Sequence, residues 1–480
     1  MVLQEELRDE VGRLADELEV PGTAVGVLVG DTTDVAFHGV TSVEDPLPVN
    51  QGTLFQIGST GKTYTATAIV QLAERGRIDL NAPVREYVPE LSLKDNQVAS
   101  TVTVLHLLNH TAGWDGDFFE DTGEGDDALD RYVHRMATVE QVTPLGSTVA
   151  YNNAAFALAG LVIERVTGQR YERVITESLL EPLGLKHSLF SAKQIMTYRF
   201  ANGHRRWEDG RISITRPWDT GRYGAPMGGM ASSVPDQLSW ARFHLGDGRT
   251  EGGIRILSEA WLTQMQEPTV VCPGSALGDA VGIAWLLRDV EGVRVVAHGG
   301  TTSGQHSIFE MVPERRFALT SLTNSGPNGA EFNENIYRWA FEAYLGITIK
   351  DPEPIRQTDE ELSPYVGRFE TISTIYDVTI ADGGLSIDAE DRPEVLEQLG
   401  EEPSDEPPDP VGMLSGDGDR YVVTGGSAKG MRGFFTRDAS GYVDGMHIGG
   451  RLARRAGVGV VRSRGPSSLS TSSEGHRQRG

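Results

Sequence analysis

The tetrad Ser59-Thr60-Gly61-Lys62 combines residue types that can do chemistry, and it stands at the start of a predicted helix. Residues three apart on a helix share one face, so the Ser59 hydroxyl and the Lys62 amine are expected within hydrogen-bonding reach. A serine hydroxyl is a weak nucleophile until a base takes its proton. Lysine can be that base when burial and the positive end of a helix dipole lower its pKa, whereas arginine stays protonated. The tetrad therefore predicts an activated serine.

Lysine is scarce in this chain, which has six lysines against 37 arginines, and Lys62 is the only lysine before Lys94. A lysine at this position of so arginine-rich a chain suggests that the chemistry needs the amine itself, which arginine could not replace. The tetrad alone identifies nothing, because S-x-x-K also arises by chance. Gly61-Lys62-Thr63 resembles the end of a phosphate-binding loop, but that motif needs glycine where Gln56 stands.

A second group, Tyr151-Asn152-Asn153, precedes another predicted helix. A phenol can relay a proton between a nucleophile and a leaving group, and the Asn153 amide can bind a substrate carbonyl. Taken alone, the tyrosine is explained equally well by packing and Asn153 by helix capping.

A third group, His298-Gly299-Gly300-Thr301, follows a predicted strand. Gly299 and Gly300 at a strand edge let a ligand backbone approach closely. The backbone N–H of Thr301 can pair with that of Ser59 as an oxyanion hole. His298 by itself is an ordinary loop histidine.

Apolar periodicity predicts the elements that hold these groups. Strands are expected at both ends of the first 345 residues around a helical middle, with amphipathic helices at the two extremes. This is an α+β fold with an inserted helical lobe, and the cleft between sheet and lobe is the expected site. The expected strands are 23–29, 35–39, 282–287, 293–297, 307–312 and 317–323, and the expected helices are 3–18, 64–75, 104–109, 154–167 and 331–344.

At 480 residues the chain is longer than one compact domain usually is. Residues 351–361 are rich in proline and acidic residues and are expected to form a linker. Short alternating segments then predict a small antiparallel β-domain, a barrel, with an acidic loop at 401–410. The expected division is a catalytic domain at 1–350, the linker at 351–361, the β-domain at 362–460 and a disordered tail at 461–480.

The chain carries 43 basic and 68 acidic residues, a formal net charge of −25, which argues against nucleic-acid and anionic-membrane partners. The acidity and scarce lysine fit either a salt-rich cytoplasm or a coding bias toward arginine. The absence of a long apolar run and of a signal-peptide pattern leads us to expect a cytoplasmic protein. A single cysteine, Cys272, excludes an intramolecular disulfide.

Residues 115–127 hold seven acidic side chains in thirteen positions, which suggests calcium. The spacing does not fit, because Phe119 stands where a third ligand belongs. We expect a solvated loop at the cleft mouth, no metal and no cofactor. His106, His110 and His306 do not predict a Ser-His-Asp hydrolase, because the chain lacks a G-x-S-x-G turn.

The chain resembles serine β-lactamases and penicillin-binding proteins, because it carries three of their motifs in the same order: S-x-x-K, Y-x-N and H-G-G. The resemblance is strongest to the class C-like branch, which includes D-aminopeptidases, D,D-carboxypeptidases and esterases. The similarity covers about residues 20–345, and the β-domain from Tyr365 looks like the lipocalin-like appendage of some members. The segments that also resemble the family are 55–59 (FQIGS), 107–113 (LLNHTAG), 181–185 (EPLGL) and 225–230 (APMGGM).

The resemblance implies a β-lactamase/transpeptidase-like antiparallel sheet flanked by helices, and an acyl-enzyme mechanism. Ser59 would be the nucleophile and Lys62 its base. Tyr151 would protonate the leaving group and activate the deacylating water, while Asn153 would hold the acyl-side carbonyl. The N–H groups of Thr301 and Ser59 would form the oxyanion hole.

His298 departs from the family pattern, which usually has a lysine there to bind a substrate carboxylate. A largely neutral histidine favours esters, amides or D-amino-acid peptides over efficient β-lactam hydrolysis. We therefore expect a serine hydrolase acting through an acyl-enzyme on a small-molecule or short-peptide substrate. The alternatives are a catalytically idle β-lactamase fold used for binding or assembly and, among enzymes, a weak β-lactamase or a carboxylesterase.

Overall fold

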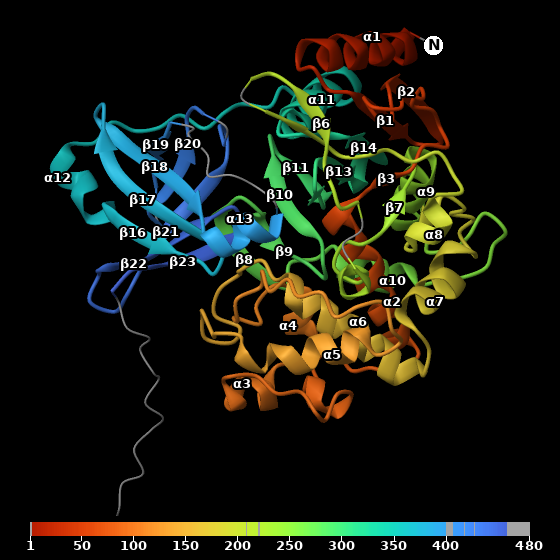
Figure 1. Ribbon diagram of the computed structural model, residues 1–480, viewed down its shortest axis with the longest axis horizontal. Coiled ribbons are helices and arrows are strands. Elements are labelled where there is room, and N and C mark those ends of the chain that lie inside the picture. The colour runs from red at the N-terminus through yellow and green to blue at the C-terminus, as the bar shows by residue number, and fades with distance from the viewer. Residues whose placement is uncertain are drawn as a thin grey trace, which may run out of the picture.

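The computed structural model describes residues 2–207, 209–218, 221–399, 407–416, 418–426 and 428–457. The predicted tail at 461–480 and most of the predicted loop at 401–410 lie outside the described residues. Figure 1 shows two bodies side by side, a larger body of sheet and helices and a barrel drawn in cyan and blue.

The larger body is built on a nine-stranded sheet of order β2-β1-β14-β13-β11-β10-β9-β8, with β12 paired to β13. Its neighbouring strands pair antiparallel, and β1 from the start of the chain lies beside β14, so the two ends of this part share one sheet. The strands are β1 (Gly22–Val29), β2 (Thr32–Gly39), β8 (Val270–Ser275), β9 (Gly278–Val281), β10 (Leu286–Val290), β11 (Val293–Ala297), β12 (Gly300–Thr302), β13 (Gln305–Val312) and β14 (Phe317–Thr323).

Helices cover both faces of this sheet, which is why every residue of β14 is buried. On one face α1 (Val2–Glu17) and α11 (Asn328–Leu345) pack apolar side chains against the sheet. The other face carries α9 (Val234–Leu245) and the helical lobe, drawn mainly in orange in Figure 1. The remaining helices are α2 (Lys62–Glu74), α3 (Asn96–Thr101), α4 (Val104–Leu108), α5 (Ala128–Arg135), α6 (Asn153–Thr167), α7 (Tyr171–Ile175), α8 (Ala192–Ile195) and α10 (Glu259–Met265).

Two small three-stranded sheets pair short strands from separate parts of the larger body. The first has the order β3-β7-β4 and the second the order β15-β5-β6. Because β3 leads directly into the segment that carries Ser59, its pairing with β7 fixes the approach to the predicted nucleophile. The strands are β3 (Phe55–Gln56), β4 (Ser188–Leu189), β5 (His204–Arg206), β6 (Ile212–Ile214), β7 (Ala231–Ser232) and β15 (Ser325–Gly326).

The predicted α+β architecture is confirmed, and β11 and β14 have the predicted bounds. The predicted strand at 282–287 is wrong over residues 282–285, which form the turn between β9 and β10. Ile283 and Ala284 donate backbone N–H bonds to Met265 and Leu108 in place of a strand ladder. The apolar run is therefore buried against the lobe, and a short apolar run does not distinguish these two outcomes.

The barrel is a closed antiparallel sheet whose eight strands follow chain order from β16 to β23. Its interior is packed with apolar side chains, among them Phe369, Tyr421 and Met446. The predicted loop at 401–410 is wrong at its end, because β19 begins at Asp409. The elements are α12 (Asp359–Leu362), β16 (Gly367–Glu370), β17 (Thr374–Ala381), β18 (Gly384–Asp391), α13 (Pro393–Leu399), β19 (Asp409–Met413), β20 (Arg420–Val423), β21 (Arg432–Arg437), β22 (Val443–Ile448) and β23 (Arg451–Arg455).

Candidate active site

The predicted nucleophile and base lie where the chain passes from a 3₁₀ turn, Gly58–Gly61, into α2. Lys62 is the first residue of that helix, and its Nζ lies 3.0 Å from Ser59 Oγ. The two side chains thus have the proximity that their three-residue spacing predicts.

The Lys62 amine is completely buried, with 0% of the side chain exposed. Its Nζ lies 2.7 Å from Asn153 Oδ1 and 2.6 Å from the Met227 carbonyl oxygen. Burial, supported by the nearby positive charge of Arg451, holds the pKa of Lys62 well below its ordinary value. A neutral amine has two N–H bonds for these two oxygens and one lone pair, which is left facing the Ser59 hydroxyl.

The Tyr151 phenol completes a three-membered group, because it hydrogen-bonds with Ser59. Burial raises the pKa of Tyr151, so the phenol stays protonated at neutral pH. The His110 ring stacks on Tyr151 with 4.3 Å between ring centroids. Opposite pKa shifts in Lys62 and Tyr151 suit one as a proton acceptor and the other as a proton donor.

The backbone of β12 lies in direct contact with the turn that carries Ser59. A Cβ at Gly300 would lie 2.0 Å from the Ile57 carbonyl oxygen and 2.6 Å from Ser59 N. A Cβ at Gly58, whose φ is +49°, would lie 2.8 Å from Thr301 N. These contacts require glycine at both positions, and they bring the N–H groups of Ser59 and Thr301 to one place.

His298 is buried beneath this contact, with 1% of the residue exposed. Its Nδ1 lies 2.7 Å from the Gly299 carbonyl oxygen, and its Nε2 has no partner among the residues that the structure describes. Burial, helped by the charge of Lys62, lowers the pKa of His298 to about 3. His298 is therefore neutral at pH 7 and does not supply the positive charge that a lysine would bring to this position.

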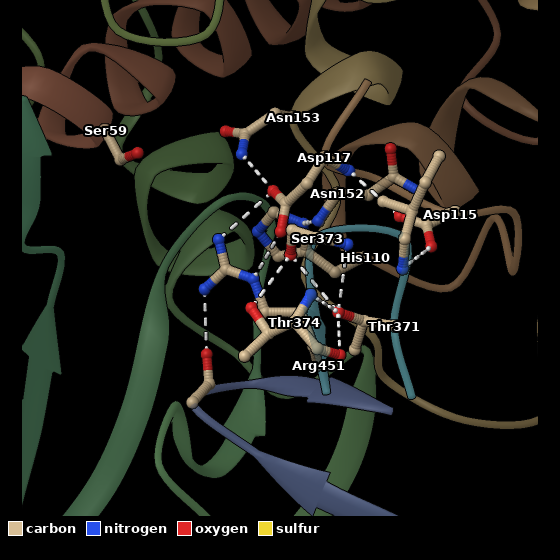
Figure 2. Close-up of polar contacts among 12 residues, drawn as sticks. Ser59, His110, Asp115, Asp117, Asn152, Asn153, Thr371, Ser373, Thr374 and Arg451 are labelled. Atoms are coloured by element: carbon tan, nitrogen blue, oxygen red, sulfur yellow. Dashed lines mark hydrogen bonds and ion pairs between the residues drawn. The ribbon is translucent and has the colours of Figure 1, made fainter. Parts of the chain in front are cut away.

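Two charged residues that the sequence analysis missed adjoin this group. Asp117 Oδ1 accepts a 2.8 Å hydrogen bond from Asn153 Nδ2, and Asp117 Oδ2 accepts a 2.9 Å hydrogen bond from Arg451 Nε on β23 (Figure 2). The prediction of a solvated loop at 115–127 is wrong for Asp117, whose side chain is only 11% exposed. It is wrong for Asp115 too, because this carboxylate accepts a hydrogen bond of 3.2 Å from the backbone N–H of Ile372.

The barrel reaches the site through the turn between β22 and β23. The Gly450 carbonyl oxygen accepts a 2.8 Å hydrogen bond from the backbone N–H of Tyr151. His447 Nε2 lies 3.0 Å from the Val149 carbonyl oxygen. A cavity of about 250 Å³ adjoins this turn between the two bodies, and it is lined by Asp117, Thr371, Ser373, Thr374, Tyr376, Ile448, Gly449 and Arg451.

The described residues contain no group of three or more His, Cys, Asp or Glu side chains arranged to hold a metal ion. No described helix has both the length and the apolar character needed to cross a membrane.

Comparison with known families decides the assignment, because a family model described as Beta-lactamase matches residues 7–344. The chain belongs to the Beta-lactamase family. Penicillin-binding protein 4 of Amycolatopsis lactamdurans is 33% identical to this family member over 364 residues, which are 74% of this chain and 95% of that relative. Protein flp of Staphylococcus aureus (strain NCTC 8325 / PS 47) is 26% identical over 293 residues, which are 60% of this chain and 56% of that relative.

Solved structures support the fold of this Beta-lactamase family member. SurE is 22% identical, with a TM-score of 0.72 over 94% of this chain and 99% of SurE. The octameric penicillin-binding protein homologue from Pyrococcus abyssi is 21% identical, with a TM-score of 0.62 and the same coverage. A class C β-lactamase from Rhodobacter sphaeroides is 23% identical, with a TM-score of 0.57 over 68% of this chain and 97% of that chain. At these identities the likeness establishes the fold alone.

The predicted site residues thus gather in one place in this family member. The predicted nucleophile, base and phenol are in mutual contact, with Asn153 beside the amine. The described residues hold one further charged pair at this place, Asp117 with Arg451, and no local sequence signal indicated it.

Proposed function

We propose that this protein is a serine hydrolase that acts through an acyl-enzyme on Ser59. The observation that carries the proposal is the buried Lys62 amine, 3.0 Å from the Ser59 hydroxyl and low in pKa. Such an amine can take the hydroxyl proton as the serine attacks a carbonyl carbon. Membership of the Beta-lactamase family supports serine hydrolase chemistry in general.

In the proposed mechanism, Ser59 Oγ attacks the substrate carbonyl as Lys62 Nζ accepts the proton. The backbone N–H groups of Ser59 and Thr301 stabilise the negative oxygen of the tetrahedral intermediate. The protonated Tyr151 phenol passes a proton to the leaving group and is restored from the lysine. Water then hydrolyses the acyl-enzyme, with the same groups acting in reverse.

Asn153 holds the substrate and the base together in this proposal. Its Oδ1 accepts from Lys62, and one N–H of its Nδ2 donates to Asp117. The second N–H of Nδ2 remains for the acyl-side carbonyl of the substrate.

The proposed substrates are esters, amides or D-amino-acid peptides of small size, in preference to β-lactams. A neutral His298 leaves the carboxylate of a β-lactam without the cation that lysine provides in this family. SurE, which shares the fold at 23% identity with a TM-score of 0.73, was solved with D-Leu, and this supports including D-amino-acid compounds. The expected cytoplasmic location remains part of the proposal.

A substrate panel tests this function: p-nitrophenyl esters, D-amino-acid p-nitroanilides and a chromogenic cephalosporin are assayed side by side. We expect kcat/KM for the preferred ester or anilide to exceed that for the cephalosporin by about 100-fold or more, the size of one lost charge-assisted contact. A cephalosporin turned over fastest would contradict the substrate class. Failure to hydrolyse any of the three would favour the idle binding protein.

Replacing Tyr151 with phenylalanine is expected to lower kcat by about 10² to 10⁴-fold, the usual contribution of a positioned proton donor. Folding should persist, because the ring that stacks on His110 is retained. The matched control is Tyr171→Phe, which removes another buried phenol whose oxygen lies 2.7 Å from Thr65 Oγ1. Steady-state kinetics of both variants check the role, and a Tyr151→Phe enzyme with the kcat of Tyr171→Phe would remove the phenol from the mechanism.

A further inference from the structure

A chain of polar contacts leads from the barrel to the predicted base. Arg451 on β23 donates to Asp117, Asp117 accepts from the Asn153 amide, and the Asn153 carbonyl oxygen lies 2.7 Å from Lys62 Nζ. Figure 2 shows the Asp117 carboxylate between the Asn153 amide and the Arg451 guanidinium. The contacts span residues from four separate parts of the sequence, so only the assembled fold forms them.

Arg451 holds Asp117 in a fixed geometry. Its Nε and Nη2 lie 2.9 and 3.2 Å from the two carboxylate oxygens, which is the two-pronged pairing that only a guanidinium provides. Its Nη1 donates a 2.8 Å hydrogen bond to the Gly449 carbonyl oxygen, which ties the side chain to its own turn. The guanidinium carbon lies 4.8 Å from the centroid of the Tyr151 ring.

The carboxylate of Asp117 in turn decides how the Asn153 amide is oriented. An ionised carboxylate only accepts hydrogen bonds, so the NH₂ group of Asn153 must face Asp117. The amide oxygen is then left facing Lys62. Without Asp117, a flipped amide would present its NH₂ group to the amine and remove one of the two oxygens that hold it.

The two charges also act on Lys62 in opposite directions. The positive charge of Arg451 lowers the pKa of Lys62, and the negative charge of Asp117 raises it. Burial lowers the pKa of His298 to about 3 and that of His110 well below its usual range, so both are neutral beside the amine.

Two other groups near the amine carry little weight in this balance. The Tyr151 phenol stays protonated, because burial raises its pKa. The Asp115 carboxylate accepts hydrogen bonds from the backbone N–H groups of Asp117 and Ile372. The charge that bears on Lys62 is therefore set by Asp117 and Arg451.

We propose that Asp117 and Arg451 are positioning residues of the reaction, through which the barrel completes the catalytic centre by fixing the Asn153 amide and, with it, the Lys62 amine. This inference rests on the proposed function. It makes the barrel a working part of the enzyme, because the arginine comes from β23.

The competing explanation is that the pair only fastens the barrel to the larger body. Other contacts already do so, since the Gly450 carbonyl accepts from the Tyr151 N–H and His447 Nε2 lies 3.0 Å from the Val149 carbonyl. A fastening role would lower the stability of the variants but leave the reaction rate of the folded protein unchanged. The plateau rate of the folded variants therefore separates the two explanations, and the pH dependence tests the effect of the two charges on the base.

The test measures the rate at which a fluorophosphonate probe modifies Ser59 as a function of pH. In the wild-type chain this rate rises as Lys62 loses its proton. Arg451→Gln removes a charge that lowers the pKa, so the rising limb should move to higher pH by about half a unit or more. Asp117→Asn removes a charge that raises the pKa, so the limb should move to lower pH by a similar amount. Both variants should lose about 10-fold or more of the plateau rate, because Arg451→Gln removes the group that fixes Asp117 and Asp117→Asn removes the charge that orients the Asn153 amide.

Two further variants separate charge from geometry. Arg451→Lys keeps the charge and loses the two-pronged pairing, so its plateau should fall while its rising limb stays in place. The control is Arg454→Gln, the same substitution at an arginine three residues further along β23 that is outside the contact chain. Its rising limb and plateau rate should match those of the wild type. Near-ultraviolet circular dichroism and the midpoint of thermal unfolding report whether each variant is folded. If Arg451→Gln does not fold, the isosteric Asp117→Asn carries the test alone: a limb at lower pH with a lower plateau rate would support the inference, and an unmoved limb would overturn it.

Opposite shifts of the rising limb in Asp117→Asn and Arg451→Gln, each with a lower plateau rate in the folded variant, would support the inference. Unmoved limbs, shifts in one direction only, or wild-type plateau rates would overturn it while leaving Ser59 as nucleophile. If the wild-type chain shows no labelling of Ser59, the proposed function fails, and this inference fails with it.

Discussion

Replacing Ser59 with alanine is expected to abolish turnover of every substrate that the wild-type enzyme hydrolyses. Loss of the nucleophile of a serine hydrolase typically costs about 10⁴ to 10⁶-fold in kcat, because no acyl-enzyme forms. The side chain is small and contacts the Lys62 amine and the Tyr151 phenol, two groups of the site itself, so the fold should survive the change. The measurement is steady-state kinetics with the best ester or anilide, together with fluorophosphonate labelling.

The matched control is Ser100→Ala, which removes an exposed hydroxyl on α3 that donates to the Gln97 carbonyl oxygen of its own helix. This variant should keep wild-type kcat and labelling. Ser59→Ala enzyme that retained a tenth of wild-type kcat would show that another residue is the nucleophile.

Replacing Lys62 with arginine is expected to lower kcat/KM by about 10² to 10⁴-fold, the range that a general base contributes. The mechanism needs a neutral amine at this position, whereas a guanidinium stays protonated at any accessible pH and cannot receive a proton from Ser59. The substitution also places a larger group in a fully buried space beside Asn153. The variant should therefore also be less stable, with a lower midpoint of thermal unfolding.

The pH profile distinguishes loss of the base from loss of packing. Because the pKa of Lys62 is held well below its ordinary value of 10.5, wild-type kcat/KM should rise with pH and level off well below pH 10.5. The amine is protonated below its pKa, so activity is lost as the pH falls through that value. In Lys62→Arg this rising limb should disappear, while the control Lys193→Arg, at an exposed lysine on α8, should keep it. A Lys62→Arg enzyme with the wild-type profile would mean that another base acts.

The parts of the site that could be predicted from sequence are those set by local geometry. Ser59 and Lys62 meet because they are three residues apart on one turn, and Asn153 begins α6 as a polar residue before an apolar helix. The strand β14 could be predicted because it opens with the apolar run Phe317-Ala318-Leu319, although its buried second half also holds Thr320, Ser321 and Thr323.

The pairing of Asp117 with Arg451 could not be predicted, because 334 residues separate them and docking of the barrel brings them together. Composition indicated a solvated loop at 115–127, since acidic residues are usually exposed. The barrel changes that outcome by supplying a guanidinium to Asp117 and a backbone N–H to Asp115.

The most direct test of the account is mass spectrometry of the enzyme quenched within the first turnover of a p-nitrophenyl ester. We expect a mass increase equal to the acyl group. Peptide mapping should place it on the peptide that contains Ser59, and it should be absent from Ser59→Ala. Rapid hydrolysis with no covalent adduct, or an adduct on a different residue, would contradict it.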